Sequence, residues 1–220
     1  MGGGSFPIDI LLFGMIAAFL VLRLRGILGR RTGFERPADA PSNVVGLRPA
    51  APVVDVSPEP AAAARALPPP NSPAGRALLQ MQGLDRTFDA GHFLAGGEAA
   101  FRIIVGAFAQ GDRVSLRPLL TDATYASFDG AITGRETAGE TQRSEIRALP
   151  AVSIEEAGLI GTVAAITVRF VSDQIAETLD KAGKPVAGAD AVTEITDLWT
   201  FERDLSAPGP AWLLSAARSG

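Results

Sequence analysis

The first apolar segment of the chain is FPIDILLFGMIAAFLVL, residues 6–22, and its one charged residue is Asp9. At a rise of about 1.5 Å per residue, a helix of this length is near the minimum that crosses the hydrocarbon core of a bilayer. The pattern predicts a transmembrane anchor over residues 6–28, preceded by a short tail at residues 1–5. A buried core helix is the alternative interpretation.

Arginines follow this apolar run in the stretch RLRGILGRRTG and none precedes it; the first four are Arg23, Arg25, Arg30 and Arg31. A secretory signal peptide has the opposite order, with its positive charge before the apolar run. Positive charge stays on the cytoplasmic side of a membrane, so we expect the N-terminus outside and the remaining chain in the cytoplasm. These arginines then form the footing of the anchor. A nucleic-acid patch is the alternative.

A proline- and alanine-rich segment follows at residues 29–72. Ten of the sixteen prolines of the chain lie between Pro37 and Pro73. The segment has no consistent period of 2 or 3.6, which is typical of an extended, semi-rigid linker. The linker would tether a domain at residues 73–220.

Helical periodicity begins after Ser72-Pro73, a pair typical of a helix N-terminus. Apolar residues then recur on one helical face at Ala77, Met81, Leu84 and Phe88. A longer helix is expected over residues 89–110, ending at Gly111. A short helix is expected over residues 114–120, and another from Thr121-Asp122 to residue 138 with Tyr125, Phe128 and Ile132 facing inward.

The period changes to two in the last third of the chain. In TVAAITVRFVS, Ile166, Val168 and Phe170 alternate with Thr167 and Arg169, as in a strand with one covered face. A preceding strand is expected over residues 144–156, with Pro150 at a bend or edge. Turn residues at 181–183 join two antiparallel strands, and TEITDLWTFERDL and AWLLSAA complete the set. The expected fold class is α+β, with helices packed on a curved antiparallel sheet.

Composition excludes several kinds of chemistry. The chain has no cysteine and a single histidine, His92, so thiolate sites and most zinc sites are excluded and we expect no metal or cofactor. The formal net charge of −4 argues against nucleic acid as a partner.

Several sequence blocks resemble a known family. They are FDAGHFLAGGEAAFRIIVGAFAQGDRVSLRPLL (88–120), the spacing of Phe128, Ile132, Arg135, Glu136 and Gly139, ITVRFVSDQI (166–175), and EITDLWTFERDL (194–205) with PGPAWLLSA. Together they resemble the C-terminal domain of the mitochondrial inner-membrane translocase tether, the forty-four-kilodalton Tim subunit, from about residue 74 to 218. The N-terminal apolar run resembles the anchors of bacterial, TimA-like members.

The resemblance implies a cone-shaped fold of the nuclear transport factor two-like kind, with a hydrophobic groove. It also implies a scaffold at the bacterial inner membrane, with the N-terminus in the periplasm and the domain in the cytoplasm. Implied partners are anionic lipid and a protein: a translocase, a chaperone or an envelope factor. The charged helical region that docks the chaperone in the mitochondrial protein has no counterpart at residues 37–73.

Three function classes remain open. A scaffold or adaptor for protein translocation, envelope biogenesis or quality control is the main hypothesis, and a lipid groove protein is the first alternative. Related cone folds host enzymes, which is the second alternative. The candidate catalytic residues do not form a set of nucleophile, base and orienting group, so we expect no enzyme; they are His92, Tyr125, Asp122, Glu136 and Asp197.

Two candidate binding surfaces follow from the apolar patterns. An apolar groove for an acyl chain or a partner segment is expected from Phe93, Phe101, Ile104, Phe170 and Trp199. A lipid-facing helix is expected to present Arg76, Leu78, Met81 and Arg86. For both sets, packing into the protein's own core is the alternative.

The orientation of the anchor predicts where the domain lies. A reporter fused after Gly33 is expected to be in the cytoplasm, because the arginines before the fusion point hold the chain on that side. Activity of a reporter that works only in the periplasm would contradict this orientation, and a fusion before Phe6 is the matched control.

Overall fold

The computed structural model describes residues 63–207 and 211–219. The expected anchor at residues 6–28, its arginines and most of the linker lie outside the described residues. Residues 57–220 form one compact unit. Every buried residue of the main hydrophobic cluster lies between Ala77 and Leu214, so this segment contains its own core.

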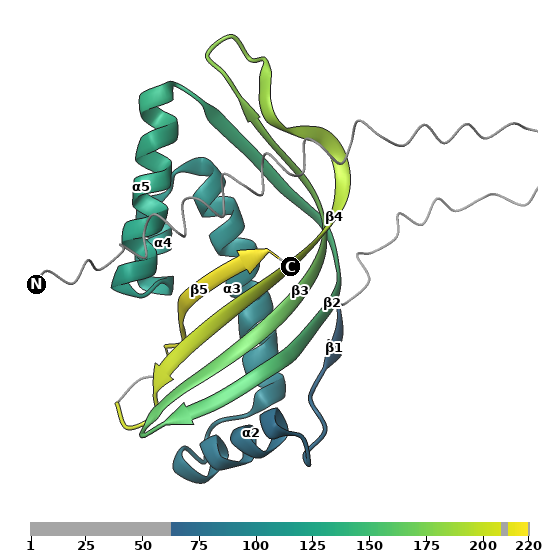
Figure 1. Cartoon of the computed structure of the whole chain (residues 1–220), viewed down its shortest axis with the longest axis vertical. Helices are drawn as coiled ribbons and strands as arrows, with labels where there is room; N and C mark the ends of the chain where they lie inside the picture. The colour runs from purple at the N-terminus through teal and green to yellow at the C-terminus, as the bar shows by residue number, and fades with distance from the viewer. Residues whose placement is uncertain (1–62, 208–210, 220) are drawn as a thin grey trace, which may run out of the picture. The chain divides into compact units, whose positions relative to one another are not determined.

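Five strands form one sheet in the order β1-β2-β3-β4-β5. The strands are β1 (Ala64–Ala66), β2 (Thr141–Ile160), β3 (Val163–Leu179), β4 (Pro185–Asp204) and β5 (Leu213–Ser219). Strands β2 to β5 are an antiparallel meander. Figure 1 shows the three long strands curving together along the length of the domain.

The expectation of an antiparallel sheet is wrong at one edge, because β1 pairs with β2 in parallel and makes the sheet mixed. Ala64 and Ala66 lie opposite Ala151 and Ser153. Arg65 reaches from this strand to Glu98 of the central helix at 2.9 Å. Three residues that we assigned to the linker therefore belong to the sheet; a strand this short carries no alternating pattern that could reveal it.

In the described part of the chain, four helices and one 3₁₀ turn accompany the sheet: α2 (Pro73–Leu84), α3 (Ala90–Gln110), α4 (Arg113–Leu116), η1 (Arg117–Leu119) and α5 (Asp122–Ala138). Their ends follow the sequence. Ser72 accepts the N–H of Gly75, and Thr121 accepts the N–H of Thr124. Gly111 ends α3 in the left-handed region at φ 69°, where glycine is favoured.

The core lies between the inner face of the sheet and helices α2 and α3. Phe101 of α3 is fully buried and stacks on Phe170 of β3 with ring centroids 4.4 Å apart. The ring of Trp199 in β4 lies 4.7 Å from the ring of Phe101. Ile132 of α5 is buried, as expected, whereas Tyr125 and Phe128 are half-buried.

Helix α3 is long and apolar enough to cross a membrane, and it is the one such helix in the described part of the chain. Its Phe101 and Ile104 are buried against the sheet, while Arg102 and Ile103 are exposed. This one-sided burial is that of a core helix in a folded domain.

Two local sequence signals correspond to features of the sheet. Pro150 lies where the register between β2 and β3 shifts, between Ala148 and Ala151, so the expected bend is confirmed. The β3–β4 hairpin turns where expected, and Asp180 accepts the backbone N–H groups of Ala182 and Lys184.

The aromatic contacts of Phe101 make it the most sensitive core position. Phe101→Ala is expected to lower the free energy of unfolding by about 3–5 kcal/mol. The reason is that α3 and the sheet cannot move together enough to fill the cavity left by the ring. Val114→Ala, at a side chain 84% exposed, is expected to change it by less than about 0.5 kcal/mol. Denaturant unfolding of residues 57–220 measures both. A Phe101→Ala loss as small as that of the control would contradict the packing.

Candidate functional site

A half-open pocket of about 410 Å³ lies between the first half of α3, the end of β4 and the residue before β5. This volume is within the range of small-ligand sites. Its lining consists of Thr87, Phe88, Asp89, His92, Phe93, Gly96, Gly97, Ala100, Leu119, Phe201, Arg203 and Trp212. These residues belong to the α2–α3 connection, α3, the η1 turn, β4 and the residue before β5. Helix α3 and strands β4 and β5 are labelled in Figure 1.

One wall of the pocket is aromatic. The rings of Phe93 and Trp212 lie 4.7 Å apart edge to face, and Phe88 packs on Trp212 at 5.9 Å. Phe201 meets Phe93 at 6.0 Å in a T-shaped contact. Tilted and edge-on pairs are favourable arrangements of aromatic rings, so these contacts hold the wall in place.

Gly96, Gly97 and Ala100 of α3 also line the pocket and carry no large side chains. A Cβ at Gly97 would lie 4.0 Å from the rings of Phe170 and Phe201, so this position packs on the aromatic side chains. Gly96 is exposed, and a Cβ there would meet no atom within 4 Å.

A partly buried ion pair borders the pocket. Arg203 of β4 contacts Asp85 at 2.9 Å, and the two side chains are 13% and 12% exposed. Asp85 also accepts two hydrogen bonds from Thr87, one from its backbone N–H at 2.9 Å and one from its hydroxyl at 2.6 Å. The Thr87 hydrogen bonds and then Arg203 hold the pKa of Asp85 below its ordinary value. The carboxylate is therefore charged at neutral pH.

The expected apolar groove is mostly core. Phe101, Ile104, Phe170 and Trp199 are at most 6% exposed and pack on one another or on the sheet, and they do not line this pocket. Of the five expected groove residues, Phe93 lies in the pocket wall. The cause is that the aromatic stripe of α3 faces the sheet directly, so most of its rings are packed against strand residues.

The expected lipid-facing set on the first helix is also divided. Leu78 and Met81 are buried in the domain core, whereas Arg76 and Arg86 are exposed. Leu84, which we expected to face inward, is 54% exposed. The apolar face of α2 thus packs on its own domain, which was the alternative interpretation.

The five candidate catalytic residues lie in four separate places within the described residues. His92 is at the exposed mouth of the pocket. Asp122 and Tyr125 lie at the start of α5, and both contact Arg117. The guanidinium of Arg117 is 2.5 Å from a carboxylate oxygen of Asp122 and 5.0 Å from the centroid of the Tyr125 ring. Asp197 accepts Ser219, and burial raises the pKa of its carboxyl. No two of these places share a reacting centre.

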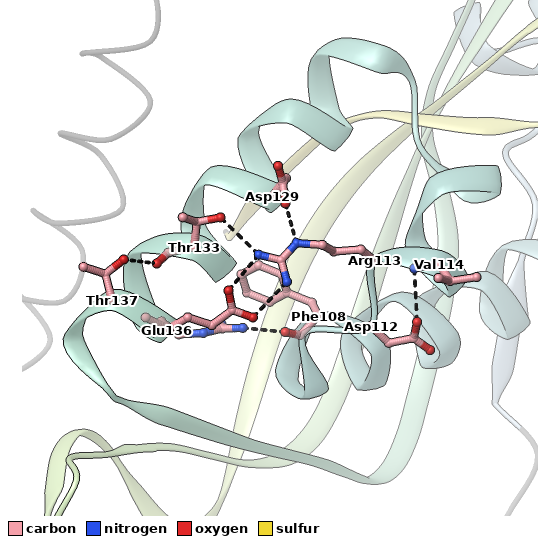
Figure 2. Close-up of polar contacts among 9 residues, drawn as sticks. Phe108, Asp112, Arg113, Val114, Asp129, Thr133, Glu136 and Thr137 are labelled. Atoms are coloured by element: carbon pink, nitrogen blue, oxygen red, sulfur yellow. Dashed lines mark hydrogen bonds and ion pairs between the residues drawn. The ribbon is translucent and has the colours of Figure 1, made fainter.

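Glu136, the fifth candidate, belongs to a network that joins α4 to α5 (Figure 2). Arg113 donates to both carboxylate oxygens of Glu136 at 2.8 and 2.9 Å, to Asp129 at 2.5 Å and to Thr133 at 3.0 Å. These bonds raise the pKa of Arg113 and lower the pKa of Glu136. The neighbouring Arg135 lies over the ring of Phe108 at 4.4 Å. Glu136 therefore connects α5 to α4, and Arg135 connects α5 to α3.

No group of three or more histidine, aspartate or glutamate side chains converges as a metal site within residues 63–207 and 211–219. Sequence reasoning missed most of the pocket, including Phe88, Trp212 and Arg203. The signal for Arg203 was its alternation with Trp199 and Phe201 on one face of a strand. Its partner is Asp85, which lies 118 residues earlier in the chain.

These observations define the class: an α+β domain with helices on one face of a mixed five-stranded sheet and an apolar pocket at one end. Residues 74–219 match the Tim44-like domain. Because this match spans more than half of the chain, the chain belongs to the Tim44-like domain family. The resemblance inferred from the sequence blocks is confirmed.

Two solved structures match part of this chain at low sequence identity. The intermembrane-space region of the chloroplast protein ARC6 is 15% identical with a TM-score of 0.44, covering 60% of this chain and 96% of that chain. A putative dehydratase of the NTF2-like family from Streptomyces avermitilis is 13% identical with a TM-score of 0.34, covering 60% and 96%. No curated protein matches this chain.

The ion pair at the pocket predicts a dependence of stability on pH. Because the pKa of Asp85 is lowered in the folded state, its contribution is present above the ordinary value of 3.8 and is lost as pH falls through the folded-state value. Asp85→Asn is expected to lower stability at pH 7, and its difference from the unmodified chain is expected to shrink below about pH 3.8.

Denaturant midpoints between pH 2 and 7 measure this effect. Glu156→Gln, at an exposed position of β2, is the matched control and is expected to leave the midpoint unchanged at pH 7. A difference between Asp85→Asn and the unmodified chain that stays constant with pH would show that the lost group is not a titrating one.

Proposed function

We propose that this chain is a membrane-anchored scaffold or adaptor that presents its Tim44-like domain at the cytoplasmic face of the bacterial inner membrane. The support for anchoring is the apolar run at residues 6–22 with arginines on one side. The support for a binding role is the aromatic pocket, which is the single observation that carries the proposal. The partner is a translocase, a chaperone or an envelope factor, with anionic lipid as a further contact of the domain.

The pocket favours binding over catalysis for a chemical reason. Its one buried ionisable pair is Asp85 and Arg203, and each neutralises the other at 2.9 Å. A general acid or base works best with a pKa near the working pH, and the carboxylate here has its pKa moved away from neutrality. The proposal is therefore that the domain is not an enzyme, with a cone-fold enzyme as the remaining alternative.

A lipid or acyl chain is the rival occupant of the pocket. A volume of about 410 Å³ and an aromatic lining suit a flexible apolar chain as well as they suit a side chain of a protein. The position of the domain beside a membrane would supply such chains. Both occupants use the same site, so one experiment at the mouth of the pocket addresses both.

Photocrosslinking from the mouth tests the proposal. A benzophenone side chain at His92 of the full-length chain in native membranes is expected to yield a crosslink to a protein or lipid. Gly96→Leu is expected to remove most of it, because Gly96 lines the pocket and a larger side chain there would obstruct it. Gly134→Leu, on the exposed face of α5 with no atom within 4 Å of its Cβ, is the matched control and is expected to keep the crosslink.

Asp190 provides a second crosslinking position on the β3–β4 hairpin, at the other end of the sheet from α2 (Figure 1). A product obtained equally from Asp190 and His92, or one that Gly96→Leu leaves intact, would contradict a role for the pocket. Loss of function in His92→Ala, Tyr125→Phe or Glu136→Gln with the crosslink unchanged would instead favour the enzyme alternative.

A further inference from the structure

The first half of β4 has one edge without a neighbouring strand. β5 pairs with β4 only from Asp197, opposite Ser219, to Glu202. Residues 185–196 of β4 pair with β3 on one side, and within the described residues no strand lies on the other side. Figure 1 shows β5 beside the lower part of β4 and the β3–β4 hairpin extending beyond it. Because alternate backbone groups of an edge strand point outward, this edge offers N–H and C=O groups to a further strand.

The part of this edge next to β5 has the composition of a strand-pairing segment. We call residues 192–196 the open edge. The register of β4 on β3 shifts between Ala189 and Thr193, and this bulge separates the open edge from the tip of the hairpin. Every residue of the open edge except Glu194 is β-branched, which favours strands. Val192 is 57% exposed. A short added strand would therefore continue the ladder where β5 leaves it.

A pair of like charges lies beside the open edge. Glu194 is directly opposite Asp173 of β3, and carboxylates at directly opposed positions destabilise a sheet. Within the described residues, neither carboxylate makes a hydrogen bond or an ion pair. The adjoining part of β2 carries two arginines that contact other carboxylates: Arg143 and Arg147 bind Glu145, Glu177 and Asp190. The repulsion between Glu194 and Asp173 is thus left without a neutralising group.

This repulsion selects among the possible occupants of the open edge. A strand added there would place one side chain beside Glu194 on the same face of the sheet. A second copy of the open edge would add its own Glu194, and the valine-rich segment VVDV (53–56) of this chain would add Asp55. Both would increase the negative charge. A lysine or arginine in that position would neutralise it, so the charge favours a basic segment of another protein.

We propose that the open edge binds an extended segment of a protein partner by strand addition, with a lysine or arginine of that segment beside Glu194. Backbone hydrogen bonds to the edge supply affinity, and the basic side chain supplies specificity. Small or β-branched side chains on either side of it meet Val192 and Thr196. This surface goes beyond the proposed function, because it is a second protein-binding site, on the part of β4 away from Phe201 and Arg203 in the pocket.

Two peptides with blocked ends test the assignment, TVTKTVT and TVTETVT. Each reads the same in both directions, so either strand orientation can place the central residue beside Glu194 and the valines beside Val192 and Thr196. The protein is residues 57–220, the compact unit that contains the core. Calorimetric titration measures affinity. TVTKTVT is expected to bind about tenfold more tightly than TVTETVT, because exchange of the central residue turns attraction to the carboxylates into repulsion.

Charge reversal tests the residue that is assigned to the basic side chain. Glu194→Lys is expected to reverse the preference, so that TVTETVT binds more tightly. Glu202→Lys is the matched control on the same strand, at a position where Leu213 of β5 already covers the edge. It is expected to keep the preference for TVTKTVT. Bound TVTKTVT is also expected to slow deuterium exchange of the backbone amides at residues 192–196 and to leave residues 198–202 unchanged.

Glu194→Gln separates binding from folding. Removal of one of two opposed charges is expected to leave the denaturant midpoint of the domain the same or higher. The preference for TVTKTVT is expected to fall to about threefold, because Asp173 alone then attracts the lysine. A lower midpoint in this variant would show that the carboxylate stabilises the sheet, which contradicts the repulsion on which the proposal rests.

The other outcomes are equally decisive. Equal binding of the two peptides, a preference that Glu194→Lys leaves in place, or a reversal in Glu202→Lys as well would overturn the assignment to Glu194. Failure of both peptides to bind, or binding without slower exchange at residues 192–196, would overturn strand addition at this edge. None of these results bears on the pocket, which crosslinking from His92 tests separately. A product obtained from Asp190, close to the open edge, is expected to differ from the product obtained from His92.

Discussion

The packing of α3 on the curved sheet is the constraint on which the rest of this domain depends. Phe101 stacks on Phe170 at 4.4 Å and contacts Trp199, so the middle of the helix is held against β3 and β4. One turn earlier the same face of the helix carries Gly97, where an added Cβ would lie 4.0 Å from the rings of Phe170 and Phe201. The helix is therefore held close to the sheet along this stretch. The pocket lies beside this contact, where Phe93, Phe201 and Trp212 contribute to its lining.

An ion pair stabilises the end of the domain at which the pocket lies. The connection between α2 and α3 is held to the end of β4 by the contact of Asp85 with Arg203 across 118 residues of sequence. Both side chains are largely shielded from water, so screening by salt is small and loss of either partner would leave a charge in a poor environment. The same contact that closes the fold at this end also points a guanidinium at the pocket border. Stability and the chemistry of the site are properties of one pair.

The local parts of the structure follow from the sequence, and the non-local parts do not. Helix ends at Ser72, Gly111 and Thr121 are set by side-chain and backbone preferences within a few residues, so the pattern predicts them. The strand at Ala64–Ala66 is held by pairing with residues near 151, and three residues carry no period. Periodicity identifies the buried face of α3, yet it cannot tell a face that meets the sheet from one that borders a void. That distinction depends on Phe88 and Trp212, which are brought together only by the fold.

The charge arrangement also limits what kind of site this is. An arginine stays protonated at every physiological pH, and the pKa of its carboxylate partner is lowered, so neither group changes its charge near neutrality. This ion pair therefore contributes fixed charge to the pocket border and no proton that moves at neutral pH. Asp197 and Glu136 lie in other contacts, with Ser219 and Arg113. The ionisable groups of these contacts hold elements of the domain together.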